Sequence, residues 1–504
     1  MSHIDLTAPQ PGDAAAKFLA RGAHQNFISG KWTPSAGGNN FDTLDPATGK
    51  TIGTLARSDA QDVDAAVAAA REAFDTGAWP RMTPMERSQI LWKIADLIEA
   101  NIDELAELET MDQGKALYVG RWAEIPGAVA QFRYFAGMAT KIEGSTIPNS
   151  INYQPEGKEV FSYTLKQPVG VVGAIVPWNS PLVLTAMKLA PALAAGCTIV
   201  LKPSEDTSLT AIRLAELMAE AGLPDGAINL ITGYGAEAGA ALANHRDVNK
   251  IAFTGSTATG RAILDAAKGN LKRVTLELGG KSPVIIMPDA DLDAAIPGAA
   301  NAIFFNGGQV CIAGSRLYVH DDVFDNVIEG VAEYAKTIKL GHGLNPDTQM
   351  GALISKQHAA KVADYIDGAR KDGASLLTGG NAVGDNGSFI EPTVVTDVRP
   401  DMAISREEIF GPVLVASRFA DTDEVMALAN DSDYGLAAGI WTESLSDATR
   451  MANRLQAGTV WINSHAMYDA SLPIGGIKQS GWGRDSGQAA LENYLELKTV
   501  CAIY

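Results

Sequence analysis

One cysteine, one glutamate and one asparagine lie in sequence contexts that suit chemistry at a carbonyl group. Cys311 ends the run Asn306-Gly307-Gly308-Gln309-Val310-Cys311, in which two glycines leave backbone amides bare in front of the thiol. Glu277 ends a β-prone run, and Asn179 follows Pro177-Trp178 at the end of an apolar run. A thiolate can attack a carbonyl, a carboxylate can act as a general base, and an amide can hold an oxyanion. The three residues therefore suggest a nucleophile, a base and an oxyanion donor.

Each of these residues also has a structural interpretation. An isolated cysteine is most often a buried packing residue, and an asparagine shortly before Pro181 favours a turn. A glutamate at the end of a strand is commonly exposed to solvent. Residue type and spacing alone leave these alternatives open. The other two cysteines, Cys197 and Cys501, lie in apolar surroundings and are expected to serve packing.

Length and charge exclude several classes of protein. With 504 residues the chain is too long for one ordinary core, so two or more lobes are expected. Hydrophobic residues make up 46% of the chain and charged residues 20%, which excludes general disorder. A formal net charge of −19 argues against a nucleic-acid partner, which would need a basic face. Three cysteines cannot build a disulfide framework, and this favours a reducing, cytoplasmic location.

Neither a metal site nor a membrane segment is expected. The seven histidines are scattered and show no zinc-ligand spacing. Residues 167–187 carry no charge, but prolines interrupt them, so we expect a buried strand and a helix rather than a membrane span. The N-terminus lacks a basic leader with an apolar core, so no signal peptide is expected. Residues 1–24 are expected to form a loose, polar extension.

The periodicity of the chain predicts an α/β fold. From residue 169 onward β-prone runs alternate with helical runs, which is typical of parallel sheets with helices on both faces. A second alternating series follows residue 280, so we expect two doubly wound lobes, which bind ligands at the carboxyl ends of their strands. Strands are predicted at 169–176, 198–202, 228–231, 250–253, 273–278, 284–287, 315–319, 413–419, 438–442 and 460–463. Helices are predicted at 58–74, 85–99, 102–111, 182–195, 209–221, 259–267, 292–305, 323–338, 423–429 and 447–455.

Seven motifs in register make the chain resemble the NAD(P)-dependent aldehyde dehydrogenase superfamily over nearly its whole length. Three of them surround Asn179, Glu277 and Cys311, and the last two residues are 34 positions apart (311 − 277). The other four are Lys202-Pro203-Ser204-Glu205, Phe253-Thr254-Gly255-Ser256, Glu408-Ile409-Phe410-Gly411-Pro412 and Pro473-Ile474-Gly475-Gly476-Ile477-Lys478-Gln479-Ser480-Gly481. The resemblance implies an NAD-binding domain at residues 1–142 and 166–279 and a catalytic domain at 280–480. An oligomerisation arm and C-terminal tail are implied at 143–165 and 481–504.

The resemblance implies roles for the three candidate residues. Cys311 falls on the family's nucleophile, Asn179 on its oxyanion donor, and Glu277 on the base that hydrolyses a cysteine thioester. We therefore expect oxidation of an aldehyde to a carboxylic acid. Glu277 argues against relatives that pass the acyl group to coenzyme A, since they generally lack this glutamate. The remaining rival is a binding or structural protein that kept the fold, and the joint retention of these residues disfavours it.

The resemblance also implies an NAD site. A carboxylate at Glu205 would accept a hydrogen bond from the ribose 2′-hydroxyl and repel a 2′-phosphate, so NAD is favoured over NADP. Ser256 and the first amides of the following helix would bind the pyrophosphate, and Glu408 and Phe410 would hold the nicotinamide end. The implied cofactor residues are Val176, Pro177, Trp178, Lys202, Ser204, Glu205, Gly255, Ser256, Gly279, Glu408 and Phe410.

The implied substrate tunnel favours a bulky, uncharged aldehyde. Ser180 stands where many relatives carry phenylalanine, which widens the tunnel, and no arginine is present to hold a second acid group. An aromatic cage for betaine aldehyde would have only Tyr468 in support. The stretches around Cys311 and Met467 look most like phenylacetaldehyde and related aryl aldehyde dehydrogenases, while betaine-type and other aliphatic aldehydes are the alternatives. The tunnel residues are Ser180, Leu184, Met187, Phe305, Val310, Ile312, Met467 and Tyr468.

Two segments are predicted to form a small β arm. Residues 144–157 are polar, contain proline and asparagine, and interrupt the helical pattern. The tail from Tyr494 to Tyr504 is apolar and β-prone, so it is a candidate to pair with this arm in another subunit. We therefore expect a homo-oligomer, and a tetramer is favoured over a dimer.

Overall fold

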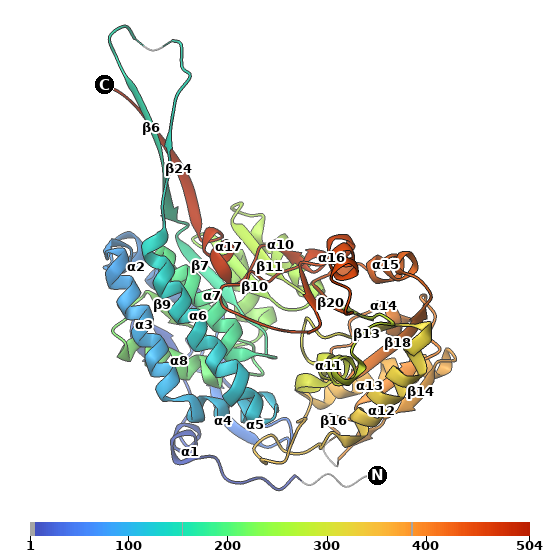
Figure 1. The fold of residues 1–504 in the computed structure, drawn as a ribbon. Helices are drawn as coiled ribbons and strands as arrows, with labels where there is room; N and C mark the ends of the chain where they lie inside the picture. Colours follow the sequence, from blue (N-terminus) through green and yellow to red (C-terminus); the bar gives the residue numbers. More distant parts are fainter. Residues whose placement is uncertain (1–5, 154, 385–386) are drawn as a thin grey trace.

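An eight-stranded sheet forms the centre of the first lobe (Figure 1). The computed structural model describes residues 6–153, 155–384 and 387–504. The strand order is β2-β1-β9-β8-β7-β10-β11-β23, and the five strands from β9 to β11 run parallel. The order reverses beside β7, which creates the crevice where doubly wound sheets bind ligands. The strands are β1 (Asn26–Ile28), β2 (Lys31–Thr33), β7 (Val171–Ile175), β8 (Thr198–Lys202), β9 (Ile228–Leu230), β10 (Lys250–Thr254), β11 (Arg273–Glu277) and β23 (Gly481–Trp482).

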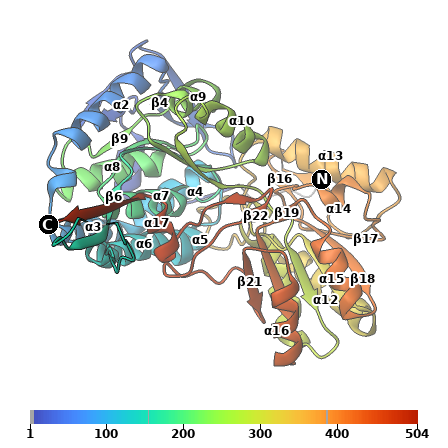
Figure 2. The same ribbon diagram turned by 90° about the horizontal axis from the view of Figure 1, so that it is seen from above.

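Helices cover both faces of this sheet and complete two hydrophobic cores (Figure 2). Helices α2, α9 and α10 pack on one face, and α3, α4, α6, α7 and α8 pack on the other. Local signals fix where they begin, since Asp59 and Asp62 form a capping box at α2, and Thr83 and Glu86 form another at α3. The helices are α2 (Ala60–Asp75), α3 (Pro84–Ala100), α4 (Ile102–Gln113), α5 (Leu117–Val119), α6 (Ile125–Met138), α7 (Pro181–Ala195), α8 (Leu209–Glu220), α9 (Ala240–Asn244), α10 (Thr257–Ala267) and α17 (Gly487–Glu492).

A seven-stranded sheet forms the second lobe, in the order β14-β17-β18-β13-β12-β20-β21. Its pairs are parallel except for β14 with β17. Helices α11 and α12 pack on one face, whereas α13, α15 and α16 contribute to two further apolar clusters. The strands are β12 (Pro283–Ile286), β13 (Arg316–His320), β14 (Ser375–Thr378), β17 (Thr393–Thr396), β18 (Val413–Phe419), β20 (Ala437–Trp441) and β21 (Thr459–Ile462). The helices are α11 (Leu292–Phe304), α12 (Phe324–Thr337), α13 (Lys356–Lys371), α14 (Ala403–Arg406), α15 (Thr422–Asn430) and α16 (Leu445–Arg454).

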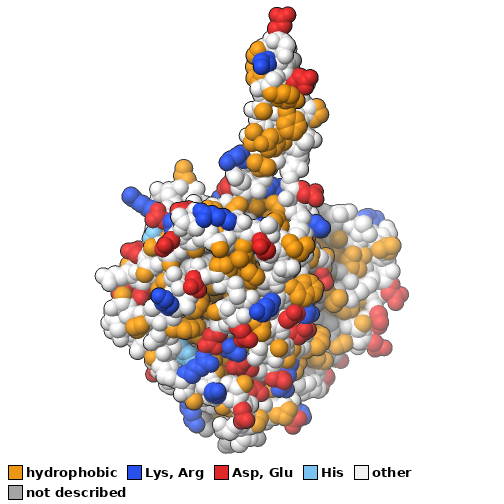
Figure 3. Space-filling view, turned by 90° about the vertical axis from the view of Figure 1, so that its left-hand side faces the viewer, with side chains coloured by type: hydrophobic (Ala, Val, Ile, Leu, Met, Phe, Trp, Pro, Cys, Tyr) orange, Lys and Arg blue, Asp and Glu red, His pale blue; other side chains and the backbone are white. Residues whose placement is uncertain are grey.

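A three-stranded arm projects from the first lobe (Figure 1). Its strands are β5 (Thr146–Ile147), β6 (Val160–Pro168) and β24 (Leu495–Ile503), with β6 in the centre and both pairs antiparallel. The C-terminal tail thus pairs with β6 of its own chain. The pairing with another subunit stays a prediction, which now concerns the outer edges of β5 and β24. Figure 3 shows apolar side chains along the projecting arm, and those exposed are Ile147, Tyr153, Phe161, Leu165, Leu497, Ile503 and Tyr504.

The two doubly wound lobes and the β arm confirm the predicted fold class. The strand and helix predicted within residues 167–187 are β7 and α7, and no helix among the described residues is long and apolar enough to cross a membrane. The domain limits stay a prediction, although β23 pairs with β11, so that the chain returns to the first sheet before it forms β24. Short paired strands complete the fold, namely β3 (Asn40–Leu44), β4 (Thr51–Ala56), β15 (Ala382–Val383), β16 (Phe389–Ile390), β19 (Tyr434–Gly435) and β22 (Ile477–Lys478).

The predicted loose N-terminal extension is wrong for the part that the structure describes. Residues Asp13–Leu19 form helix α1, whose Ala15 and Phe18 are fully buried in the first core. The amide of Gly12 donates a hydrogen bond to Glu107 of α4, at 2.7 Å. Phe18 and Leu19 are the two large apolar residues of this alanine-rich helix, so its periodic signal is weak, but the burial of Phe18 fixes the helix against the core. Residues 1–5 of the expected extension lie outside the described residues.

Candidate active site

Cys311 lies in a loop whose backbone requires unusual conformations. Helix α11 ends at Phe304, and the next three residues after Phe305 have positive φ angles: 50° at Asn306, 63° at Gly307 and 70° at Gly308. A side chain at Gly308 would also collide with the backbone of Gly411. The glycines are therefore needed for the turn that carries the half-buried Cys311 toward the other lobe. The amides of Cys311 and Ile312 lie against its sulfur.

Hydrogen bonds hold Asn179 against the Cys311 loop. The Asn179 Nδ2 donates to the carbonyl of Gln309 at 3.0 Å, and the Asn306 Nδ2 donates to the carbonyl of Asn179 at 3.2 Å. Gln309 is fixed in turn, because its Oε1 accepts from the amide of Ile354 at 2.9 Å. One hydrogen of the Asn179 amide is thereby used, and its second hydrogen stays available. The structure thus places Asn179 against the loop that carries Cys311, through a bond between residues 130 positions apart.

Glu277 lies at the carboxyl end of β11 in a buried site lined by glycines. Its Oε1 is buried without a hydrogen-bond partner, and a side chain at Gly475 would collide with that oxygen. Burial raises the pKa of Glu277 well above its ordinary value, and Asp485 raises it further, although Lys188 lowers it. Lys188 and Asp485 themselves form a buried ion pair at 2.5 Å. The resting carboxyl is therefore protonated far more readily than a surface glutamate.

The thiolate character expected of Cys311 is absent from this resting structure. Burial raises the pKa of the Cys311 thiol to about 12, and the carboxyls of Glu408 and Glu277 add to the shift. The neighbouring amides lower the pKa but do not offset these causes. A helix N-terminus or bare amides can favour a thiolate, but burial together with the two carboxyls outweighs the amides here. The resting nucleophile is a neutral thiol.

Glu408 joins the two lobes beside the Cys311 loop. The amide of Gly280 donates to Glu408 Oε1 at 2.9 Å, and a side chain at Gly279 would collide with Glu408 Oε2. Burial raises the pKa of Glu408 to about 7, while the Gly280 amide and Lys281 oppose the rise. Gly279 and Glu408, both predicted cofactor residues, are thus in direct contact.

A cluster of polar groups lies at the carboxyl edge of the first sheet, beside the point where its strand order reverses. Lys202 Nζ, at the end of β8, is 2.9 Å from Glu205 Oε2, and the amide of Gly235 donates to Glu205 Oε1 at 3.3 Å. Burial opposes ionisation of Glu205, but the Lys202 ammonium outweighs it and holds the pKa of Glu205 below its ordinary value. A fixed carboxylate at this edge can accept a hydrogen bond and repel an anion.

The remaining cofactor candidates surround the same crevice. Ser256 is the N-cap of α10, where its Oγ accepts from the amide of Thr259 at 3.2 Å, and the amide of Gly255 is bonded to the carbonyl of Glu277. The ring of Trp178 packs edge-on against Phe410, with 5.2 Å between their centroids. Val176 and Ser204 are buried and Pro177 is half-buried on the loops that follow β7 and β8.

The predicted tunnel residues come from three elements. Leu184 and Met187 lie on the first two turns of α7, and Phe305, Val310 and Ile312 lie in the Cys311 loop. Met467 and Tyr468 follow β21, and Tyr468 lies beside α6, because a side chain at Gly127 would be 3.8 Å from the Tyr468 ring. His465 also approaches the loop, with its Nε2 2.7 Å from the carbonyl of Ile312. Burial lowers the pKa of His465 to about 4, so this ring adds no positive charge.

A buried charge network behind Ser180 was missed in the sequence. Ser180 Oγ donates to Glu124 Oε1 at 2.9 Å, and Lys115 Nζ lies 3.4 Å from the same oxygen and 2.7 Å from Glu109 Oε1. Glu109 Oε2 in turn accepts from the amide of Leu182 at 3.1 Å, in the first turn of α7. The three charged residues lie on α4 and the segments after it, where nothing in their local spacing marks them.

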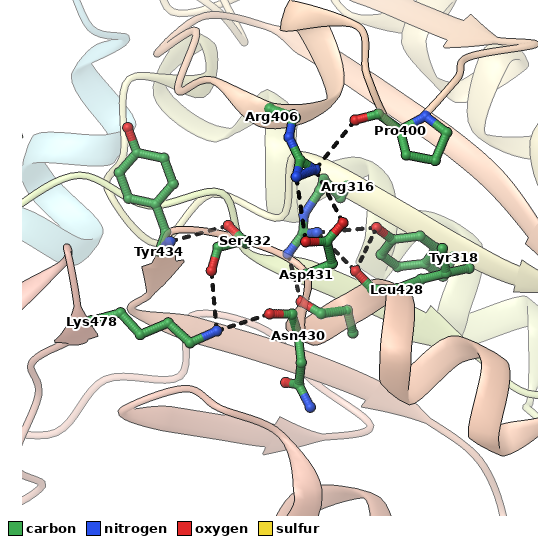
Figure 4. A network of polar contacts seen from close by, with 11 residues as sticks. Arg316, Tyr318, Pro400, Arg406, Leu428, Asn430, Asp431, Ser432, Tyr434 and Lys478 are labelled. Atoms are coloured by element: carbon green, nitrogen blue, oxygen red, sulfur yellow. Dashed lines mark hydrogen bonds and ion pairs between the residues drawn. The ribbon is translucent and has the colours of Figure 1, made fainter.

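The motif from Pro473 to Gly481 bridges the two lobes. The Ser480 hydroxyl donates to the carbonyl of Gly279 at 2.7 Å and accepts from the amide of Gly435 at 3.0 Å. Figure 4 shows the far end of this bridge, where Lys478 donates to the carbonyls of Asn430 and Ser432 just after α15. Arg316 binds carbonyls of the same helix end, which suits its partial negative charge.

No cluster of histidine, cysteine or acidic residues that could hold a metal ion occurs within residues 6–153, 155–384 and 387–504. The chemistry of the site therefore has to be read from Cys311, Asn179, Glu277 and Glu408. The structure gathers these four groups at the contact between the lobes, next to the polar crevice of the first sheet.

Comparison with known proteins identifies the family. The family model "Aldehyde dehydrogenase family" matches residues 32–500. The aldehyde dehydrogenase homologue DhaS of Bacillus subtilis (strain 168) is 52% identical over 480 residues, which cover 95% of this chain and 96% of that protein. A phenylacetaldehyde dehydrogenase of Pseudomonas fluorescens is 48% identical, with coverages of 95% and 96%. The structure of an aldehyde dehydrogenase from Bacillus cereus in complex with NAD+ has a TM-score of 0.96 at 46% identity and covers 98% of this chain and 99% of that one. The chain described here belongs to the aldehyde dehydrogenase family.

Proposed function

We propose that this enzyme oxidises an aldehyde to a carboxylic acid with NAD, through a covalent intermediate on Cys311. The observation that carries the proposal is the contact between Asn179 and the Cys311 loop, with Glu277 and Glu408 close enough to raise the pKa of the thiol. A nucleophile, an amide donor and a base are then present at one point. Use of NAD or NADP follows from the family.

In the first half of the reaction, the Cys311 thiol loses its proton to solvent, and the sulfur adds to the aldehyde carbon while the C=O π pair moves onto the oxygen. The free hydrogen of the Asn179 amide and the Cys311 backbone amide donate to the oxygen that becomes negative, and such donors contribute about 3–4 kcal/mol each. NAD, when bound, would supply the hydride acceptor, and the oxidised carbon would then remain on Cys311 as a thioester. In the second half, Glu277 takes a proton from water, which attacks the thioester and frees the acid.

The residues at the edge of the first sheet fit NAD. Glu205 presents a carboxylate fixed by Lys202 and by the amide of Gly235, so it can receive a ribose hydroxyl. Ser256 at the N-terminus of α10 offers free amides for a pyrophosphate. The Glu205 charge supports a preference for NAD over NADP, because a 2′-phosphate would be repelled. Glu408 and the Trp178–Phe410 pair are proposed for the nicotinamide end.

We propose a bulky, uncharged substrate such as phenylacetaldehyde. The tunnel candidates other than Ser180 are apolar or aromatic, and the relative from Pseudomonas fluorescens that is named for this substrate is 48% identical. Tyr468 is the one aromatic candidate for a cationic cage, and its hydroxyl lies 3.2 Å from Ser486 Oγ. Steady-state kcat/KM for phenylacetaldehyde, betaine aldehyde and succinic semialdehyde tests the proposal. Phenylacetaldehyde should be preferred by about tenfold, and a preference for either competitor would reject it.

The wider context of the enzyme is also proposed. The apolar residues on the projecting arm support a homo-oligomer, for which a tetramer is favoured. The small number of cysteines supports a cytoplasmic location. The proposed division is an NAD-binding domain (1–142 and 166–279), a catalytic domain (280–480) and an arm with tail (143–165 and 481–504); the two sheets and the arm support it, except that β23 pairs into the first sheet.

Trapping the thioester tests the proposed mechanism. Glu277→Gln should form NADH in a burst of about one equivalent per subunit and then stall, because the amide cannot accept a proton from water. The intact mass should show an acyl adduct, which maps to Cys311. When added to Glu277→Gln, Cys311→Ala should abolish both the NADH burst and the adduct, whereas Cys197→Ala should leave both in place. A Glu277→Gln variant without a burst would instead make Glu277 the base that activates Cys311.

A further inference from the structure

Ser180 is the N-cap of α7, yet its hydroxyl does not cap the helix. No side-chain capping bond is made by Ser180, and the free amide of Leu182 is satisfied by Glu109 Oε2 at 3.1 Å. Serine is favoured at this position mainly for its capping hydrogen bond, and the Ser180 hydroxyl does not make that bond. The hydroxyl instead donates to Glu124 Oε1 at 2.9 Å.

The surroundings of Glu124 fix the direction of that hydrogen bond. Glu124 is 6% exposed, and the oxygen that meets Ser180 also lies 3.4 Å from the ammonium of Lys115. An oxygen that faces a cation and a hydroxyl acts as an acceptor of both. The proton of Ser180 therefore points into the protein, toward Glu124, and the rest of its oxygen offers only lone pairs.

Ser180 directly follows Asn179, the proposed oxyanion donor. Ser180 is half-buried, whereas its partner Glu124 is buried, so part of Ser180 stays accessible. Its neighbour Asn179 contacts the Cys311 loop, and the two α-carbons are about 3.8 Å apart. A substrate whose carbonyl oxygen meets Asn179 thus carries its nearest substituents past Ser180.

We infer that Ser180 is a specificity-determining hydrogen-bond acceptor and that the enzyme favours uncharged aldehydes with a hydroxyl group near the carbonyl. The inference rests on the proposed function and narrows its substrate class. A substrate hydroxyl can donate a hydrogen bond to Ser180, whereas a carbonyl or ether oxygen at the same place has no proton to donate and gains no hydrogen bond. One neutral hydrogen bond changes a rate by about fivefold to tenfold, so the effect is measurable.

Matched pairs of substrates that differ by one hydroxyl test the inference. The pairs are propanal with 3-hydroxypropanal, and phenylacetaldehyde with its ortho-hydroxy derivative. In the wild-type enzyme the hydroxylated member of each pair should have a kcat/KM about fivefold to tenfold higher. Ser180→Ala should reduce this ratio to about one, and Ser180→Thr, which keeps the hydroxyl, should restore most of it.

Comparison within pairs separates specificity from stability, because a poorly folded variant loses activity on both members equally. A ratio that is the same in the wild type and in Ser180→Ala overturns the inference and leaves the proposed function intact. A ratio below one in the wild type does the same. A wild-type enzyme that forms no NADH with any of the four aldehydes overturns the proposed function and this inference together.

Discussion

The reactivity of Cys311 in the enzyme without cofactor should depend steeply on pH. Burial and the carboxyls of Glu408 and Glu277 raise the pKa of its thiol to about 12. Only the thiolate is alkylated at a useful rate. Raising the pH should therefore expose a nucleophile that is masked at neutral pH.

The size of the effect follows from this pKa. With a pKa of about 12, the thiolate fraction at pH 8 is about one in ten thousand, against about one in four for an ordinary cysteine with a pKa near 8.5. Alkylation of Cys311 should rise about tenfold for each pH unit and show no plateau below pH 10. Glu408→Gln removes one of the carboxyls that raise the pKa, so the rate at a fixed pH should increase severalfold.

Iodoacetamide labelling followed by peptide mass mapping measures the rate at each cysteine. Cys197 is an internal control, because it is fully buried and burial raises its pKa to about 12. Cys501 is exposed on the arm and should be labelled quickly, so the Cys501→Ser variant is used to follow the slower labelling of Cys311. A plateau for Cys311 below pH 9, or slower labelling in Glu408→Gln, would refute the reasoning.

Three further predictions concern groups around the site. Glu205→Gln should raise the NADP-to-NAD ratio of kcat/KM, because the charge that opposes a 2′-phosphate is removed, and an unchanged ratio would show that Glu205 does not face the ribose. Asp485→Asn should move the acid limb of the pH profile of kcat to lower pH, because Asp485 raises the pKa of Glu277. Lys188→Met should move this limb to higher pH, because Lys188 lowers the pKa of Glu277. Shifts of both variants in the same direction would contradict the assignment. Lys115→Met leaves two buried carboxyls without their cation and should lower the free energy of unfolding by about 3–5 kcal/mol. Denaturant titration measures this loss, and a midpoint equal to that of the wild type would contradict the prediction.

Much of the fold could be predicted because its signals are local. Strand β8 occupies the predicted range 198–202, and strand β18 occupies 413–419, since both are β-prone runs with a proline next to one end. The predicted helices 58–74 and 85–99 lie within two residues of α2 and α3 at both ends. No helix or strand was predicted between residues 338 and 413, although Ala359, Val362, Ile366 and Ala369 of α13 have helical spacing. That helix carried a usable signal in a polar sequence.

The residues of the candidate site likewise fall into those marked by local sequence and those defined only by the tertiary fold. Cys311, Glu277 and Asn179 are marked by their neighbours in sequence, and motifs located them before their contacts were known. The Ser180–Glu124 bond joins residues 56 positions apart, and the Lys188–Asp485 pair joins residues 297 positions apart. Buried lysines such as Lys115 and Lys188 look like surface residues in a sequence, because only the tertiary fold supplies the carboxyl that makes their burial tolerable.

The electrostatics of the site limit how much negative charge it can hold at one time. Ionised Glu277 raises the pKa of Cys311, so a thiolate and a second carboxylate beside it oppose each other. During attack the charge has to lie on Cys311, which favours a protonated Glu277. Once the sulfur is acylated it can no longer ionise, and the repulsion that it would exert on Glu277 disappears. The base therefore becomes easier to ionise at the step that needs it, because the charge of the thiolate passes to the aldehyde oxygen and would leave with the hydride that NAD accepts.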